Sequence, residues 1–188
     1  MNIALFGGTF DPIHNGHIHI INSVLNSGLV DEVVVSPAYT SPHKVGNKVT
    51  ESYHRKQMIR LALQDVDKAN PWYWEIDNER VSYTSEALDV VSSFFPESEV
   101  RLMMGMDNYL VFDKWHRYEY ILENYRPIVF GRTGYEKDDR FDVDFVQCRT
   151  SGISSTEIRE KLAAGEDVDT VPPAVLEYIK GNNLYIDK

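Results

Sequence analysis

Near its N-terminus the sequence reads Phe6-Gly7-Gly8-Thr9-Phe10-Asp11-Pro12-Ile13-His14-Asn15-Gly16-His17. This stretch begins at the end of an apolar run, Ile3–Phe6, which is typical of a buried strand in a parallel sheet. It leads into the predicted helix His17–Leu25, whose apolar residues recur at helical spacing until a stop signal at Gly28. A strand, a glycine turn and a helix in this order predict the start of an α/β fold.

Strand-like and helix-like segments alternate along the rest of the chain. Thr84 is a candidate N-cap, and Ser154 with Glu157 predicts a capping box. The alternation predicts an α/β protein with a parallel sheet and helices on both faces, in one domain over residues 1–188 that is helical from about residue 153. The polar segment Gly131–Arg140 is expected to be a loop. The predicted strands are Glu32–Val35, Trp72–Ile76, Val100–Met104, Ile128–Phe130 and Phe145–Gln147, and the predicted helices are Ser52–Leu63, Ser85–Phe94, Ser155–Ala163 and the segment from Pro172-Pro173 to Gly181.

Composition excludes several classes of protein. The 19 Lys and Arg residues against 29 Asp and Glu residues give a net charge of −10, which argues against broad binding to nucleic acids or membranes. No run approaches the roughly 18 apolar residues of a membrane span. The single cysteine, Cys148, excludes an intramolecular disulfide and a cysteine metal cage, and we expect it to be a small buried residue. These features predict a cytoplasmic protein.

The glycines and histidines of residues 6–17 predict an anion site. Ligands of open α/β sheets bind beyond the carboxyl ends of the strands, and Gly7-Gly8 would let the backbone approach a ligand there. His14 and His17 share one face of the helix start, where free N–H groups and the helix dipole favour phosphate. Gly16 keeps a side chain out of the way, and Thr9 offers a hydroxyl.

The same residues also allow other interpretations. Taken alone, a histidine pair at this spacing is more often a surface or core feature, and a glycine pair is common in turns. A metal site formed by His14, His17 and His19 fits poorly, because His19 points elsewhere and no nearby acidic or cysteine ligand completes it. The stretch is not a P-loop, because no Gly-Lys-Ser/Thr follows, and it lacks the three spaced glycines of the dinucleotide fingerprint.

A second anion motif lies far along the chain, in Gly152-Ile153-Ser154-Ser155-Thr156-Glu157-Ile158-Arg159. A well-capped helix start alone would explain Ser154 and Glu157. Three successive hydroxyl residues followed by Arg159 one turn later would also bind an anion.

Together these motifs resemble the nucleotidyltransferase superfamily, which has a Rossmann-like fold, and within it the nicotinate-nucleotide adenylyltransferases. The resemblance extends from Gly7 to Tyr185. It implies that His14, His17, Lys44 and Arg159 are catalytic and neutralise phosphate oxygens. Lys44 belongs to the loop Ser41-Pro42-His43-Lys44, which on its residues alone could also be an exposed basic loop. It further implies an ATP site formed by Gly7, Gly8, Thr9, Phe10, Gly16, Arg132, Ser154, Ser155 and Thr156.

The same resemblance implies a site for the acceptor. Ser82-Tyr83-Thr84 at a helix start would bind the nicotinate carboxylate, although a capping role for Thr84 is compatible with this. Gly105 and Asp107 would bind a ribose hydroxyl, and Trp115, which on its residue type alone is more often a core residue, would stack on the pyridine ring. The chain departs from the family pattern at Ser41 and after Thr84.

The implied reaction joins ATP and nicotinate mononucleotide to give deamido-NAD and pyrophosphate, a step of NAD biosynthesis. Mg²⁺ would enter with ATP, bound to phosphate and water oxygens. Small molecules are the expected partners, with no nucleic acid and no membrane, and a homo-oligomer is left open. Alternatives are a pantetheine-phosphate adenylyltransferase, a glycerol-3-phosphate cytidylyltransferase, which Arg149–Ser155 also resembles, and a non-catalytic nucleotide-binding module. A class I aminoacyl-tRNA synthetase fragment is disfavoured because the chain is short and acidic.

Overall fold

A single parallel sheet organises the protein. The computed structural model describes residues 1–39, 49–131, 140–148 and 152–186. Six strands pair in the order β3-β2-β1-β4-β5-β6, and each neighbouring pair is parallel. The order reverses between β1 and β4, which is the place where open α/β sheets bind ligands. The strands are β1 (Asn2–Gly8), β2 (Glu32–Pro37), β3 (Ala69–Pro71), β4 (Glu99–Gly105), β5 (Ile128–Gly131) and β6 (Asp144–Gln147).

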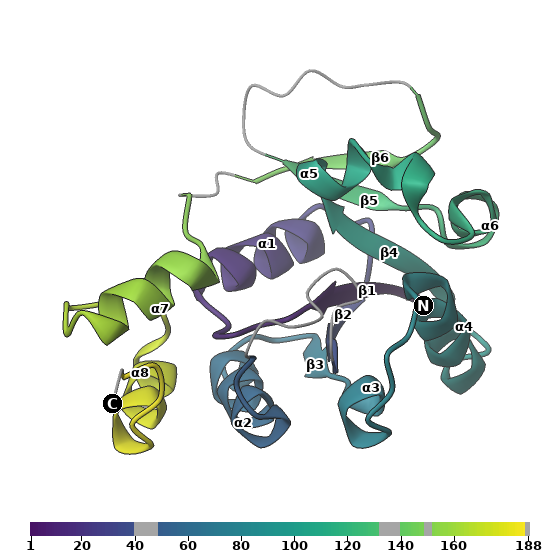
Figure 1. Ribbon diagram of the computed structural model, residues 1–188. Coiled ribbons are helices and arrows are strands. Elements are labelled where there is room, and N and C mark those ends of the chain that lie inside the picture. The colour runs from purple at the N-terminus through teal and green to yellow at the C-terminus, as the bar shows by residue number, and fades with distance from the viewer. Residues whose placement is uncertain (40–48, 132–139, 149–151, 187–188) are drawn as a thin grey trace.

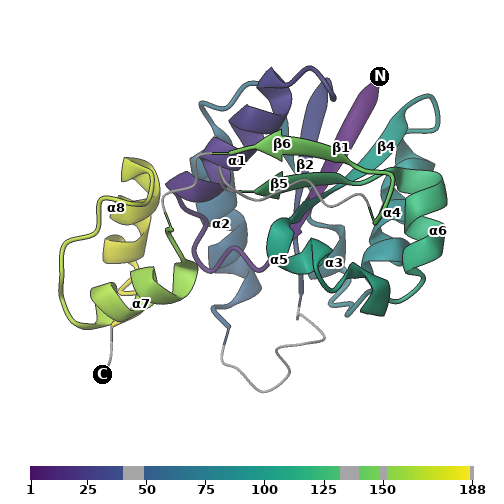
Figure 2. The same ribbon diagram turned by 90° about the horizontal axis from the view of Figure 1, so that it is seen from above.

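Helices cover both faces of the sheet. Figure 1 shows α1, α2, α7 and α8 on one face and α3, α4 and α6 on the other, with the C-terminus beside α8. In the view from above, α7 and α8 lie at the end of the molecule opposite α4 and α6 (Figure 2). The helical elements are α1 (Asn15–Asn26), α2 (Ser52–Leu63), α3 (Trp74–Asp77), α4 (Thr84–Phe94), α5 (Met106–Tyr109), the 3₁₀-helix η2 (Phe112–Lys114), α6 (Tyr118–Tyr125), α7 (Ser155–Ala163) and α8 (Pro173–Gly181). The predicted fold class is confirmed.

The alternation of side chains along β1 divides the core into two halves. Ala4 and Phe6 pack with residues of α1, α2, α7 and α8. Ile3 and Leu5 point to the other face and pack with residues of α4, α5 and α6. All four side chains are buried, as the central strand of a parallel sheet requires. Cys148 is buried in the first of these clusters, as expected.

One predicted strand is wrong. The segment Trp72–Ile76 was expected to be a strand because it is rich in aromatic and β-branched residues, but strand β3 is Ala69–Pro71 and the chain then forms the short helix α3. The register pairs Pro71 with Val35 on β2, and Trp72 makes one more bond to Val35 before the strand pairing ends. Because β3 is the edge strand and Pro71 cannot donate a hydrogen bond, little favours continuing the strand.

The helix caps differ in detail from the prediction. Tyr83, not Thr84, occupies the N-cap of α4, and the Glu86 carboxylate accepts a hydrogen bond from the Tyr83 N–H at 3.3 Å. Of the capping box predicted for Ser154 and Glu157 at α7, the Ser154 half is confirmed, since its hydroxyl accepts from the Glu157 N–H at 3.1 Å, but between these two described residues the Ser154 N–H donates no return bond to the Glu157 carboxylate. The Glu157 carboxylate pairs with Lys161 at 2.9 Å. The predicted loop Gly131–Arg140 falls largely on residues 132–139, outside the described residues.

Candidate active site

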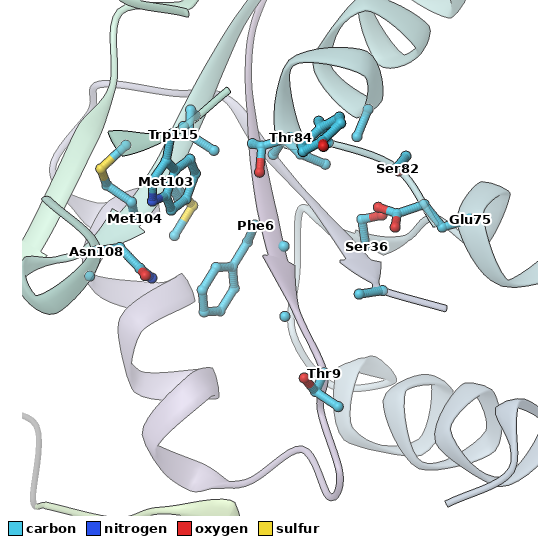
Figure 3. Close-up of a pocket in the computed structure, with 18 of the residues that line it drawn as sticks. Phe6, Thr9, Ser36, Glu75, Ser82, Thr84, Met103, Met104, Asn108 and Trp115 are labelled. Carbon is cyan, nitrogen blue, oxygen red and sulfur yellow. The ribbon is translucent and has the colours of Figure 1, made fainter. Parts of the chain in front are cut away.

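A cavity of about 560 Å³ opens at the carboxyl ends of β1, β2 and β4. This volume suits a small-molecule ligand, for which pockets of roughly 300–1,000 Å³ are usual. Figure 3 shows Trp115, Met103 and Asn108 on one side of the cavity, and Ser36, Glu75 and Ser82 on the other, with Phe6 between them. The lining comprises Leu5, Phe6, Gly7, Gly8, Thr9, Ser36, Ala38, Glu75, Ser82, Tyr83, Thr84, Ala87, Leu102, Met103, Met104, Gly105, Asn108, Lys114, Trp115, His116 and Phe130.

The chain turns back sharply where β1 ends. Phe10 adopts a left-handed backbone conformation (φ +49°), and its ring folds over Gly8. A Cβ atom on Gly8 would lie 2.9 Å from that ring, so the turn requires glycine. Phe10 is buried and packs edge-on against Phe6 and His17, with centroid distances of 5.4 and 5.0 Å. Phe10 therefore supports His17 from the core and does not line the cavity.

The two histidines at the start of α1 hold each other in a defined geometry. Their rings stack with centroids 3.7 Å apart, and the backbone N–H of His14 donates to Nδ1 of His17 at 3.2 Å. Because an N–H can only donate, Nδ1 of His17 is unprotonated, and the ring proton of the neutral imidazole lies on Nε2. Burial lowers the pKa of His14 to about 4. Burial, reinforced by His14, also lowers the pKa of His17 well below its ordinary value. Both rings are therefore neutral donors near pH 7.

Gly16 makes room for the His14 ring. A Cβ atom at Gly16 would lie 3.0 Å from two atoms of that ring and 3.7 Å from Cβ of Ile153, which precedes α7. Nδ1 of His14 is buried and has no hydrogen-bond partner among the described residues. The absence of a side chain at Gly16 thus lets His14 and the start of α7 approach the same turn.

The second anion motif lies directly against the first. The Ser155 hydroxyl donates to the carbonyl of Pro12 at 2.9 Å, and the Arg159 guanidinium donates to the carbonyl of Asp11 at 2.6 Å. Arg159 also donates to the Thr156 hydroxyl at 3.4 Å. The start of α7, about 140 residues further along the chain, therefore joins the β1–α1 turn. Ser155 and Arg159, which were expected to bind phosphate, thus donate hydrogen bonds to backbone carbonyls of the protein. Thr156 is exposed.

A buried arginine ties the loops around this turn together. Arg55 on α2 is only 1% exposed, and its guanidinium donates to the carbonyls of Thr9, Ala38, Tyr39 and Thr50 at 2.6–3.1 Å. These carbonyls follow β1, follow β2 and precede α2, so one side chain fixes the ends of three segments. Burial lowers the pKa of Arg55, and nearby Asp11 partly offsets this effect.

Asp11 is buried and works as an acceptor inside the turn. Its carboxylate accepts from the Tyr185 hydroxyl at 2.7 Å and from the Thr50 N–H at 3.2 Å. Burial raises the pKa of Tyr185, and the Asp11 carboxylate raises it further. Tyr185 was predicted to be a packing residue, and these contacts place it in that role.

Aromatic residues form the far wall of the cavity. Trp115 lines it and packs edge-on against Phe112 at 5.5 Å. The rings of Tyr83 and His116 stack with centroids 4.1 Å apart, which joins the start of α4 to the segment after η2. Gly105 lines the cavity at the end of β4, whereas Asp107 is exposed and is not part of the lining.

Glu75 is the one carboxyl on the described cavity wall. Burial raises its pKa to about 7, and the Ser82 hydroxyl, the backbone N–H of Tyr39 and Arg55 oppose the rise. The Ser82 hydroxyl faces this carboxyl without a hydrogen bond of normal geometry to any described residue. In Figure 3 the Glu75 carboxyl points toward Ser36.

The structure gathers most of the residues predicted from sequence into one region. Lys44 and Arg132 lie outside the described residues. Sequence reasoning missed Ser36, Glu75, Asn108, Lys114 and His116. Ser36 and Asn108 could have been found, because they lie at or just after strand ends. Glu75 could not, since its segment was assigned to a strand. The predicted residues on the cavity wall are Gly7, Gly8, Thr9, Ser82, Tyr83, Thr84, Gly105 and Trp115, and those around the adjoining β1–α1 turn are Phe10, His14, Gly16, His17, Ser154, Ser155, Thr156 and Arg159.

Known proteins are similar in sequence over nearly the whole chain. The family model described as cytidylyltransferase-like matches residues 5–161. The nicotinate-nucleotide adenylyltransferase of Bacillus subtilis is 31% identical over 97% of this chain and 97% of its own. The chain belongs to the nicotinate-nucleotide adenylyltransferase family. A probable nicotinate-nucleotide adenylyltransferase of Hydrogenobaculum sp. is 37% identical and covers 98% of each chain.

A solved structure shows the same fold. Plasmodium falciparum nicotinic acid mononucleotide adenylyltransferase, complexed with NaAD, aligns with a TM-score of 0.83 and 21% identity over 98% of this chain and 97% of that one. Family membership confirms the resemblance inferred from the two anion motifs, and with it an enzyme of the nucleotidyltransferase class. No described helix is long and apolar enough to cross a membrane.

Proposed function

We propose that this protein transfers the adenylyl group of ATP to nicotinate mononucleotide, giving deamido-NAD and pyrophosphate. The observation that carries the proposal is the contact between the β1–α1 turn and the start of α7, next to a cavity with Trp115 on its wall. This contact brings the N-termini of α1 and α7 together, and with them the pair His14 and His17 and the Arg159 guanidinium. The relatives that cover nearly the whole chain are named for this reaction.

The chemistry needs positioning more than acid–base catalysis. A phosphate oxygen of the acceptor attacks the α-phosphorus of ATP, a new P–O bond forms, and the bond to the bridging oxygen breaks as pyrophosphate leaves with the electron pair. The acceptor phosphate is already ionised, so no side chain has to remove a proton. The protein holds the two phosphates together and stabilises the charge that develops on the leaving group.

Each residue has a proposed role in this step. Nε2–H of His17 donates to a phosphate oxygen of ATP, with His14 beside it. Arg159 supplies a positive charge from α7, while its bond to Asp11 holds it in place. Gly7, Gly8 and Thr9 let the nucleotide approach the backbone, and Lys44 and Arg132 remain predictions for phosphate contact.

The acceptor is proposed to occupy the cavity. Its pyridine ring would stack on Trp115, and its carboxylate would bind at Ser82-Tyr83-Thr84, where the first turn of α4 leaves N–H groups without intrahelical partners. Oδ1 of Asp107 lies 3.7 Å from the place where a Cβ atom of Gly105 would stand, next to the cavity wall, and the Asp107 carboxylate is proposed to bind a ribose hydroxyl.

ATP is proposed to arrive as its Mg²⁺ complex, with the metal held by phosphate and water oxygens. Within the described ranges, no group of three or more His, Cys, Asp or Glu side chains is arranged to hold a metal ion, and Asp11 already has two hydrogen-bond donors. These side chains therefore fit a metal carried by the nucleotide. A single-domain organisation, a cytoplasmic location and a homo-oligomer remain predictions.

The test is a comparison of substrates with purified protein. With ATP, Mg²⁺ and nicotinate mononucleotide, we expect stoichiometric release of pyrophosphate and formation of deamido-NAD. Parallel reactions with pantetheine 4′-phosphate, and with CTP and glycerol 3-phosphate, test the alternatives. Turnover only in one of these, or ATP binding by calorimetry without any turnover, would contradict the proposal.

A further inference from the structure

Glu75 is a buried acidic group that the proposed reaction does not use. It lies on the wall of the same cavity as Ser82, Tyr83 and Thr84, which are proposed to bind the acceptor's carboxylate. Its side chain is only 9% exposed, and it forms no ion pair with any described residue. The carboxylate of an acceptor bound in this cavity would therefore lie near the Glu75 carboxyl.

We propose that Glu75 determines acceptor specificity, because the charge on its carboxyl sets how strongly the cavity prefers a carboxylate over a carboxamide on the acceptor's ring. The proposal rests on the proposed function and concerns only the choice between two acceptors. With Glu75 neutral, the acceptor's carboxylate is attracted by the positive end of α4, whose first turn also carries the acidic Glu86, and by the Lys114 ammonium. An ionised Glu75 opposes them and repels a carboxylate but not a carboxamide.

The groups that face Glu75 allow it to change charge near neutral pH. Arg55 approaches from α2, but its guanidinium is occupied by the carbonyls of four other residues. The Tyr39 N–H and the Ser82 hydroxyl stabilise the ionised form, and Glu86 from α4 disfavours it. The balance is dominated by burial, which raises the pKa of Glu75 to about 7.

The size of the effect follows from Coulomb's law. Two unit charges about 10 Å apart in a medium with an effective dielectric constant of about 20 interact strongly enough to change affinity on the order of tenfold. We therefore expect the ratio of kcat/KM for nicotinate mononucleotide to kcat/KM for nicotinamide mononucleotide to fall by about tenfold between pH 6 and pH 8.5.

Measuring this ratio isolates Glu75 from the other titrating groups. Both acceptors carry the same phosphate, whose second pKa is about 6, and both react with the same ATP, so their titrations cancel in the ratio. Titration of His14 and His17 cancels for the same reason. The acceptor's own carboxylate, next to a ring cation, has a pKa far below this pH range and stays ionised throughout.

The decisive variant is Glu75→Gln, which keeps the shape and removes the charge. We expect its ratio to be independent of pH and to match the low-pH value of the parent. Glu79→Gln is the matched control, because Glu79 is exposed, lies on the same segment and does not line the cavity. This control should keep the pH dependence of the parent.

Calorimetry supplies a test that does not need turnover or a stable variant. Binding of the acid acceptor to the parent near pH 7.5 should draw a proton onto Glu75, so the measured heat should depend on the buffer's ionisation enthalpy more than it does for the amide. The proposal is wrong if the ratio in the parent does not change with pH, if its change survives in Glu75→Gln, or if Glu75→Gln weakens both acceptors equally. Failure of both acceptors to react would instead contradict the proposed function.

Discussion

The backbone N–H of His14 donates to Nδ1 of His17 at 3.2 Å, and the two rings stack 3.7 Å apart. His17 thereby caps its own helix with one ring nitrogen and is left with Nε2–H as its donor. Because Nδ1 of His17 accepts this hydrogen bond, a flip of the ring would break the bond that caps α1. The same hydrogen bond thus stabilises the start of α1 and fixes the orientation of the Nε2–H of His17.

This geometry predicts which substitution of His17 removes function without loss of the fold. Asn places an oxygen near the position of Nδ1 and has nothing at the position of Nε2. In His17→Asn we expect the helix cap to persist and kcat to fall about 10²- to 10³-fold, as for the loss of one donor to a developing charge. His19→Asn on the exposed face of α1 is the control, with kcat unchanged. Steady-state kinetics and circular dichroism make the comparison, and equal kcat in both variants would contradict the assignment.

The lowered pKa values of the histidines predict how stability depends on pH. His14 titrates near 4 in the folded protein but near 6.5 when unfolded, so between these values the unfolded chain binds more protons. The free energy of unfolding must then fall as the pH drops below 6.5, by about 2 kcal/mol at pH 5 from His14 alone. Urea unfolding at pH 7.5 and 5.0 should show a smaller decrease in His14→Asn than in the parent. An identical decrease in both proteins would mean that His14 is not buried in its neutral form.

Gly16 should be more important for activity than for stability. In Gly16→Ala the new methyl group would lie 3.0 Å from the His14 ring, so the ring would have to shift from its stacked position against His17. We expect destabilisation of about 1–3 kcal/mol, as for overpacking, with a larger loss in kcat/KM for ATP. Gly181→Ala is the control, because a Cβ atom there meets nothing within 4 Å. Thermal unfolding and kinetics distinguish the two, and normal activity in Gly16→Ala would show that the ring can move freely.

Removal of the Arg55 side chain, which holds the loops around the site together, should strongly lower the free energy of unfolding. Arg55→Met would leave the carbonyls of Thr9, Ala38, Tyr39 and Thr50 without their donor in a buried place. Each buried group left unsatisfied costs about 1–3 kcal/mol, so we expect a loss of at least about 3 kcal/mol in urea unfolding. Arg60→Met on the exposed side of the same helix should change stability by less than about 0.5 kcal/mol. A small effect in Arg55→Met would mean that water replaces the guanidinium.

Local sequence signals were sufficient for much of the fold. The helices Ser52–Leu63 and Ser155–Ala163 have the predicted bounds, because the apolar spacing of both, and the Ser154 cap of the second, are encoded within or next to the segments themselves. The strand Trp72–Ile76 was wrongly predicted because edge pairing, and not β propensity, decides where β3 ends. Glu75 and Arg55 belong to no motif that the sequence analysis recognised. Their roles depend on their burial and on the segments that they contact in the fold.

The α/β class, the strand at Ile3–Phe6 and the family could be inferred from the residues alone, since periodicity, glycines and short motifs are local properties of the chain. The folded structure was needed to see that the start of α7 donates to the carbonyls of Asp11 and Pro12, and that Glu75 lies on the cavity wall. Such relations depend on how distant segments pack and exclude water, and the same burial raises the pKa of the Glu75 carboxyl.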